Sequence, residues 1–293
     1  MMKMKVIWIS LGLLFTFSLQ AQDDLLQMLE EETSNETYVV EATFKGTRLI
    51  NGHSIETRKK KNLDFIISHR FGRVNLGAYE LYGLDQSNIR LGLDYGVMNA
   101  FNIGIGRNSF EKTYDGYLKY RVLKQTYGNK SIPVSATLFS SLAIKTAKDP
   151  VFEEVINFYD RISFAHQILI ARKFSSSLSL QFMPTYLHFN SLTESQLRND
   201  IFGIGAGGRV KLTQRISLNV EYYYVLDKLS ENTHESISIG FDIDTGGHVF
   251  QLHFTNSQAM IEKGFIAETR DDFLNGDIHF GFNISRTFQL GGK

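Results

Sequence analysis

Residues 89–96 (IRLGLDYG) and 101–106 (FNIGIG) decide the fold of this chain. In both stretches, large apolar side chains alternate with charged, amide or glycine residues. Successive side chains of a β-strand point to opposite faces, so each stretch has one apolar and one polar face. The same alternation recurs over residues 216–224, 237–243 and 278–285. The pattern predicts an all-β protein in which each strand has one apolar face and one polar face.

The connections between these segments alternate strictly between short and long. An antiparallel up-and-down transmembrane β-barrel has short turns on one rim and longer loops on the other, whereas a Greek-key sandwich gives no reason for that parity. We therefore predict a barrel of about 12 strands. They are expected over residues 62–71, 88–95, 101–106, 115–124, 131–145, 161–173, 178–189, 200–212, 216–226, 236–243, 248–256 and 277–289.

One further alternating segment, residues 38–45, stands before the first of these strands. A thirteenth strand would place the two ends of the barrel on opposite rims. We therefore expect this segment outside the ring, or as half of an additional hairpin that would raise the count to 14.

Composition excludes several classes of protein. The 293 residues include 31 basic and 31 acidic side chains, and a nucleic-acid binder needs a positive excess for its phosphate contacts. The chain has no cysteine, which rules out disulfides and thiolate metal sites. It has one long apolar run, so a bundle of membrane helices is excluded as well.

The amino terminus has the pattern of an export signal. Lys3 and Lys5 precede the apolar residues 6–19, and we expect cleavage after Ala21. The alternative is a single membrane anchor, but the run is short for a hydrocarbon core of about 30 Å. Residues 22–61, acidic and then basic, are expected to form a periplasmic segment, followed by an outer-membrane barrel over residues 62–290.

Four stretches in the first half of the chain resemble an uncharacterised family of Gram-negative outer-membrane β-barrels. They are residues 44–58 (FKGTRLINGHSIETR), 63–72 (LDFIISHRFG), 83–96 (GLDQSNIRLGLDYG) and 106–120 (GRNSFEKTYDGYLKY). The resemblance extends over the mature chain. It implies a membrane-bound barrel in the outer membrane with no assigned activity, so it contributes no catalytic residue.

The alternation assigns residues to the two faces of the barrel wall. The residues expected to face lipid are Ile89, Leu91, Leu93, Phe101, Ile103, Ile105, Ile216, Leu218, Val220, Ile237, Ile239, Phe241, Ile278, Phe280 and Phe282. The residues expected to line a hydrophilic lumen are Asp64, Arg70, Arg90, Asp94, Lys119, Arg121, Arg161, Arg209, Lys211 and Glu221.

The lumen set carries both signs of charge, with more basic than acidic residues. Such charges select anionic solutes in a narrow pore, or they form salt-bridge networks that close a lumen of this strand number. The expected partners are outer-membrane lipid and small anionic solutes, with no nucleic acid.

The sequence contains only weak motifs for cofactor or metal binding. Gly203, Gly205 and Gly208 have the dinucleotide spacing, but a strand continues where that motif needs a helix, so no cofactor is expected. His253 and His279 lie on the polar faces of neighbouring predicted strands and are weak metal candidates. Two solvated lumen histidines are the preferred interpretation.

Three functional hypotheses remain. The first is a barrel that acts as a narrow channel or as a passive scaffold with functional outer loops, without enzymatic activity. The second is a lipase or protease at the outer rim, which rests on loop residues whose spacing fixes no triad: Asp227, His234, Asp271 and Asp272. The third is a secreted soluble β-sandwich that binds through its loops.

Overall fold

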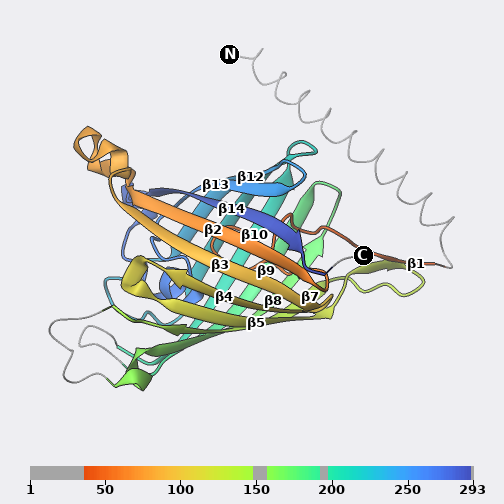
Figure 1. Cartoon of the computed structure of the whole chain (residues 1–293), viewed down its shortest axis with the longest axis horizontal. Helices are drawn as coiled ribbons and strands as arrows, with labels where there is room; N and C mark the ends of the chain where they lie inside the picture. The colour runs from red at the N-terminus through yellow and green to blue at the C-terminus, as the bar shows by residue number, and fades with distance from the viewer. Residues whose placement is uncertain (1–35, 148–156, 192–196, 292–293) are drawn as a thin grey trace, which may run out of the picture. The chain divides into compact units, whose positions relative to one another are not determined.

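A closed antiparallel barrel of twelve strands is the main unit of the protein (Figure 1). The computed structural model describes residues 36–147, 157–191 and 197–291. Each strand of the ring pairs with its neighbours in the chain, and β14 pairs with β2 to close it, as predicted. The strands are β2 (Asn62–Arg73), β3 (Ser87–Met98), β4 (Phe101–Asn108), β5 (Tyr114–Leu123), β7 (Ser135–Ile144), β8 (Ile162–Lys173), β9 (Leu178–Phe189), β10 (Asp200–Lys211), β11 (Ile216–Val225), β12 (Ser236–Asp244), β13 (His248–Thr255) and β14 (His279–Gln289).

Most connections follow the predicted parity of the two rims. The exceptions are residues 124–134 between β5 and β7, which are long on the rim of the short turns, and residues 109–113 between β4 and β5, which are short on the other rim. Asn62 at the start of β2 pairs with Gln289 at the end of β14, so both ends of the ring lie on the rim of the short turns. The long loops lie on the other rim, which we call the outer rim. They contain the 3-10 helices η1 (Val74–Leu76), η2 (Ala78–Gly83), η3 (Phe110–Lys112), η4 (Phe158–Arg161) and η6 (Phe273–Asn275), and the π-helix η5 (Lys263–Ala267).

A second, smaller unit contains the described residues 36–40 and residues 125–133. In it, β1 (Thr37–Val39) and β6 (Thr126–Gly128) form a separate two-stranded antiparallel sheet. The alternating segment that begins at Tyr38 thus contributes no strand to the ring, and the ring has twelve strands rather than 14.

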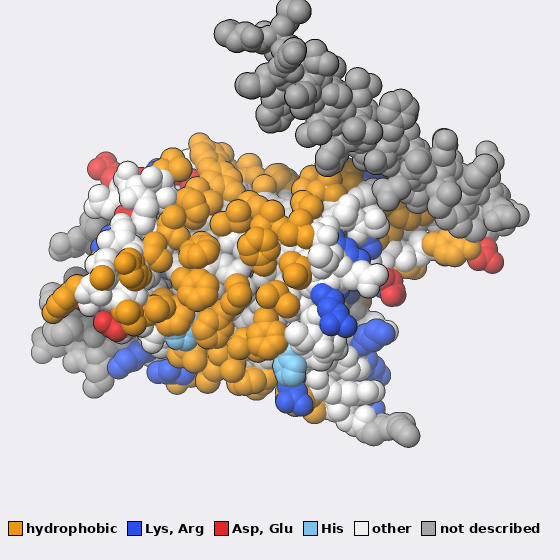
Figure 2. Space-filling model, turned by 90° about the horizontal axis from the view of Figure 1, so that it is seen from above, with side chains coloured by type: hydrophobic (Ala, Val, Ile, Leu, Met, Phe, Trp, Pro, Cys, Tyr) orange, Lys and Arg blue, Asp and Glu red, His pale blue; other side chains and the backbone are white. Residues whose placement is uncertain are grey.

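The face of the barrel seen in Figure 2 is largely covered by apolar side chains. Leu91 and Ile105 expose 45% and 64% of their surface, whereas the inward-facing Asp94 and Lys119 are completely buried. A soluble sandwich would place these residues the other way round, so the apolar face needs a bilayer. All the residues expected to face lipid are exposed or half-buried, although Ile278 lies just before β14. Within the described residues, no helix has the length and apolarity needed to span a membrane.

The lumen is filled by the chain itself. Residues 43–55, expected in the periplasm, are almost all buried and bind side chains of the barrel wall. Residues 257–269, part of the long connection predicted between strands 248–256 and 277–289, are also mostly buried and fold inward between β13 and β14. The expectation of a periplasmic segment is therefore wrong for residues 43–55, and residues 22–35 lie outside the described part of the chain.

The inner wall is polar on only part of its circumference. From β7 to β11 large apolar side chains such as Leu169, Met183 and Ile201 point inward and are completely buried. They belong to one apolar cluster that includes Leu49 from the N-terminal segment and Phe265 from the folded-in loop. The expected uniformly hydrophilic lumen is thus wrong for these strands, because the inserted segments give apolar inward side chains something to pack against.

Candidate functional site

The N-terminal segment inside the barrel, which we call the plug (residues 43–57), folds as a tight hairpin. Arg48 and His53 form an isolated antiparallel bridge. The amide of Leu49 donates to the carbonyl of Gly52 at 2.9 Å, closing a four-residue turn. The backbone amides of this turn point toward β11 and the carboxylate of Glu221.

Glu221 on β11 holds the tip of the plug. Its carboxylate accepts hydrogen bonds from the amides of Ile50 (2.9 Å), Asn51 (3.2 Å) and Gly52 (2.9 Å). The carboxylate is buried, and successive amides of a turn form an anion-binding concavity. The plug therefore supplies three hydrogen-bond donors to this buried carboxylate.

Asn51 joins the plug to three further strands. Its side-chain amide donates to Ser238 Oγ on β12 (2.8 Å) and Thr255 Oγ1 on β13 (3.2 Å). Its carbonyl oxygen accepts from Arg70 Nη2 on β2 at 2.7 Å. Both polar atoms of the side chain are thus satisfied by the wall, which fixes the depth of the plug.

Basic side chains near the short-turn rim bind the backbone of the N-terminal segment. Each donates from its ammonium or guanidinium group to a main-chain carbonyl oxygen. The pairs are Lys119 with Glu56 (2.6 Å), Lys173 with Glu41 (3.0 Å) and Arg209 with Ala42 (3.2 Å). Because carbonyl groups carry no net charge, these three hydrogen bonds are not ion pairs.

The plug meets the folded-in outer loop inside the barrel. Glu262 of that loop lies 3.5 Å from Arg48 Nη1 and 3.7 Å from His53 Nε2. All three side chains are buried. An ion pair in this position is costly to break because each partner would remain buried without the other. It connects the two segments that close the lumen.

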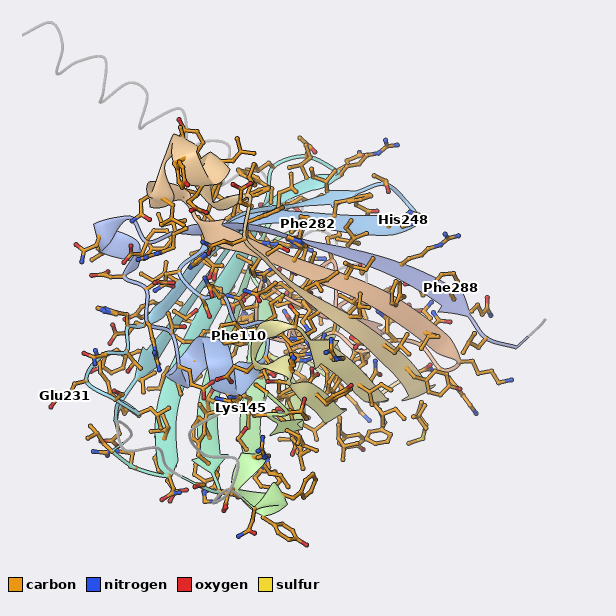
Figure 3. All side chains as sticks on the ribbon, turned by 60° about the vertical axis from the view of Figure 1, so that its left-hand side comes forward. Phe110, Lys145, Glu231, His248, Phe282 and Phe288 are labelled. Carbon is orange, nitrogen blue, oxygen red and sulfur yellow. The ribbon has the colours of Figure 1, made fainter. Side chains whose placement is uncertain are left out.

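A second charge cluster holds the folded-in loop to the loop before β5 and to Lys145 after β7, near Phe110 and Lys145 in Figure 3. Lys263 Nζ lies 3.0 Å from Glu111 Oε2 and 2.8 Å from Glu268 Oε2, and Lys145 lies 2.7 Å from Glu111. Burial opposes the charged form of Glu111, but Lys263 and Lys145 outweigh it and lower its pKa from 4.5 to about 2.

Acid is expected to loosen this loop. The pKa of folded Glu111 is depressed, so its stabilising contribution is complete above about pH 4.5 and is lost as the pH falls toward 2. Hydrogen exchange of residues 257–269 should accelerate severalfold over that interval. In Lys263→Met the exchange should already be fast at pH 7 and change little with pH. Equal acid sensitivity of both proteins would contradict the assignment.

Above the folded-in loop lies a cavity of about 660 Å³ at the outer rim. Its lining includes Arg73, Lys145, Glu268 and Arg270 together with several amide side chains. The loop that forms part of this lining also contacts the plug through Glu262. A solute in the outer cavity would therefore lie against the structure that closes the lumen.

Most residues expected in the lumen lie there. Asp64, Arg70, Arg90, Asp94, Lys119, Arg209 and Glu221 are buried, and Arg121 and Lys211 are half-buried. Arg161 is the exception, because η4 continues to this residue before β8 begins, and its guanidinium donates to the Ala147 carbonyl in an outer loop. These wall residues bind the plug, and the sequence pattern did not predict that the plug lies in the lumen.

The two histidines proposed as weak metal ligands lie on adjacent strands, offset by two residues in the register. The register pairs His253 with Gly281 and His279 with Thr255. Both ring nitrogens of His279 are engaged, by the Phe71 carbonyl at 2.9 Å and Asp271 at 2.7 Å. Among residues 36–147, 157–191 and 197–291, no group of three or more histidine or carboxylate side chains could hold a metal ion.

The loop residues of the hydrolase hypothesis are spread along the outer rim in separate pairs. Asp227 lies 2.7 Å from Arg198, and Asp271 binds His279. His234 Nδ1 is 4.0 Å from Asp272. The geometry brings these groups into ion pairs rather than into one catalytic arrangement.

Comparison with known proteins agrees with this architecture. A family model described as "Membrane bound beta barrel domain (DUF5777)" matches residues 44–288, a span that includes most of the plug. No curated protein matches the chain. The NanC porin aligns with a TM-score of 0.50 at 9% identity, covering 78% of this chain and 100% of that one. At that identity the likeness shows a shared barrel fold. Outer membrane protein Omp33 of Acinetobacter baumannii aligns with a TM-score of 0.45 at 6% identity, covering 78% and 99%.

Proposed function

Since the chain belongs to the family of membrane-bound β-barrel domains, we propose that it is a gated channel for small anionic solutes in a Gram-negative outer membrane. Residues 1–21 would serve as its cleaved export signal. The plug is the gate, and the observation that carries this proposal is its position in the lumen without being a strand of the ring. Departure of the plug leaves all twelve paired strands intact.

Anion preference follows from what the plug leaves behind. Lys119, Lys173 and Arg209 each donate to a main-chain carbonyl of residues 41–56. Once the segment has left, these cations would face water and could stabilise passing anions. The charges would then act as a selective ring rather than as anchors.

The experiment compares the mature chain with a variant that lacks residues 42–57. In planar bilayers the mature chain should stay mostly closed, whereas the shortened chain should conduct steadily and prefer chloride over potassium. Heat-modifiable migration of both proteins would show that each forms a closed barrel. A folded, shortened barrel without conductance would refute the channel, and cation preference would refute the selectivity.

A sealed scaffold is a second candidate, and the apolar packing of Leu49 and Ile55 with the β7–β11 wall favours it. The two candidates differ in the mobility of the plug. For a gate, the amides of residues 49–52 should exchange with deuterium at least tenfold faster than the core of β10. Equal protection of both would favour the scaffold.

A further inference from the structure

The outer loop between β2 and β3 presents large apolar side chains on its surface. Tyr79 exposes 93% of its surface, and Leu81, Tyr82 and Leu84 are exposed as well. These residues lie beyond the ends of the strands, in the loop that contains η1 and η2. A cluster of exposed apolar side chains marks a contact with a membrane or with a partner.

The backbone of this loop is held in the conformation that presents these side chains. Leu81 and Tyr82 have positive φ angles of 44° and 55°, which large residues rarely adopt. Such conformations persist only where the surrounding structure enforces them. The amide of Tyr82 donates to the Gly77 carbonyl at 2.8 Å, and at the base of the loop the amide of Gly72 donates to the Gln86 carbonyl at 3.1 Å. The exposed cluster is therefore a built feature of the loop.

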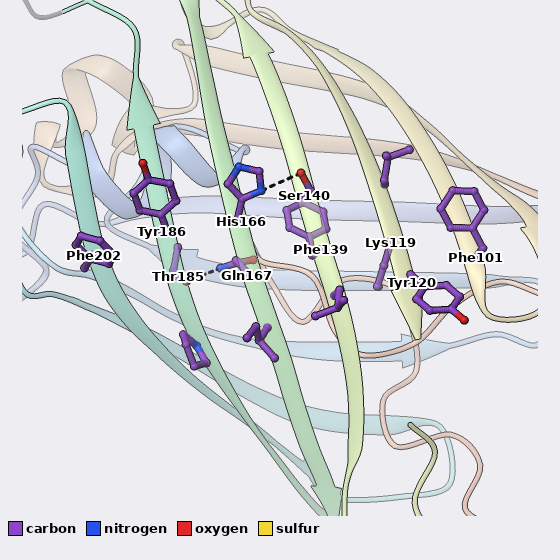
Figure 4. A pocket seen from close by; sticks show the side chains of 14 residues that line it. Phe101, Lys119, Tyr120, Phe139, Ser140, His166, Gln167, Thr185, Tyr186 and Phe202 are labelled. Atoms are coloured by element: carbon purple, nitrogen blue, oxygen red, sulfur yellow. Dashed lines mark hydrogen bonds between the residues drawn. The ribbon is translucent and has the colours of Figure 1, made fainter. Parts of the chain in front are cut away.

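The loop continues the lipid-facing surface of the barrel. Phe71 of β2 and Phe280 of β14 stack on that surface with their ring centroids 5.8 Å apart, and the loop begins at Val74, three residues after Phe71. From there it extends away from the lumen (Figures 1 and 3). Aromatic side chains also line a shallow hollow elsewhere on the lipid-facing surface (Figure 4), namely Phe101, Tyr120, Tyr186 and Phe202.

We propose that residues 78–84 are a membrane anchor that inserts into the outer leaflet at the boundary between headgroups and acyl chains. Aromatic and aliphatic side chains enter this boundary favourably, and a tyrosine hydroxyl stays hydrated there. Lipid is favoured over a protein partner because the loop adjoins the lipid-facing surface. Residues 74–86 contain Glu80 and Asp85 but no lysine or arginine, so burial of apolar surface holds the anchor rather than attraction to lipid phosphates.

Tryptophan fluorescence tests the anchor directly. The only tryptophan of the chain, Trp8, lies in the proposed export signal, so the mature chain has none. Three variants each carry one reporter: Tyr79→Trp in the loop, Leu91→Trp on the lipid-facing side of β3, and Glu231→Trp in a separate outer loop (Figure 3). In phosphatidylcholine vesicles with brominated acyl chains, Tyr79→Trp should be quenched at least about half as strongly as Leu91→Trp, and Glu231→Trp should be quenched little.

Quenching of Tyr79→Trp no greater than that of Glu231→Trp would overturn the proposal. The exposed cluster would then be left for a protein partner. The experiment does not depend on conductance, so its outcome is independent of whether the barrel is a channel.

A second series removes apolar side chains, so that the preference of tryptophan itself for lipid cannot produce the result. Leu84→Trp is the reporter. Adding Tyr79→Ser and Leu81→Ser should reduce its quenching about threefold, because less apolar surface is buried in lipid. Adding Phe158→Ser and Tyr159→Ser, which are also exposed but lie in the loop between β7 and β8, is the matched control and should leave the quenching unchanged.

Heat-modifiable migration would show that every variant forms a closed barrel. Equal quenching with both pairs of serine substitutions would refute the anchor. Quenching that requires anionic lipid would also refute it, because an anchor held by apolar burial inserts into phosphatidylcholine alone.

Discussion

Replacing Gly52 by alanine should drive the plug out of the lumen. A Cβ atom at this position would overlap the Tyr223 hydroxyl and lie 3.3 Å from Glu221 Oε1. Tyr223 cannot yield easily, because it is completely buried and its hydroxyl contacts Met183 Sδ at 3.2 Å. Overpacking of this kind costs ~1–3 kcal/mol, so the open population should rise by about five- to 150-fold.

Open probability in planar bilayers measures this effect. Gly46→Ala is the matched control in the same segment, since the nearest atoms to its Cβ are backbone atoms of Arg48 at 3.7 and 3.8 Å. The control should behave like the unmodified chain. If the two alanine variants gate alike, the turn at Gly52 does not set the position of the plug.

The loss of the Glu221 carboxylate should release the plug even more strongly. Glu221→Leu leaves the amides of residues 50–52 as three buried donors without their acceptor. Each unsatisfied donor costs ~1–3 kcal/mol, so a total of at least ~3 kcal/mol should shift the equilibrium by a hundredfold or more. Glu221→Gln, which keeps one acceptor oxygen, should give an intermediate shift.

Hydrogen exchange of the amides of residues 50–52 reports this release directly, because the same atoms donate to the carboxylate. Glu231→Gln is the control, since that side chain is exposed in an outer loop (Figure 3). Unchanged exchange at residues 50–52 in Glu221→Leu would show that apolar packing alone retains the plug.

The ring could be predicted from sequence because the bilayer and the lumen impose opposite demands on alternate residues. The polarity of residues such as Leu91 and Asp94 predicts which face of the strand each occupies, without information about neighbouring strands. Loop parity then fixed the topology, since each strand pairs with its chain neighbours. The family resemblance also agrees with the matched family model over residues 44–288.

The inserted segments could not be predicted in the same way. The plug has no period of two, and its contacts come from residues such as Glu221 and Thr255, far away in the chain. Burial of Arg48 and Asn51 depends on those distant partners, so the local sequence suggests a solvated surface. A signal was available for the outer loop, where residues 259–267 (AMIEKGFIA) are too apolar for an open loop.

The pairing of β14 with β2 closes the ring, and the plug directly precedes β2 in the chain. Before β14 pairs with β2, the sheet is open along one side, and residues 43–57 can enter through that opening. The barrel can therefore enclose the plug without threading the plug through a closed ring. Truncation of residues 279–289 should leave the ring open and the plug without an enclosing wall.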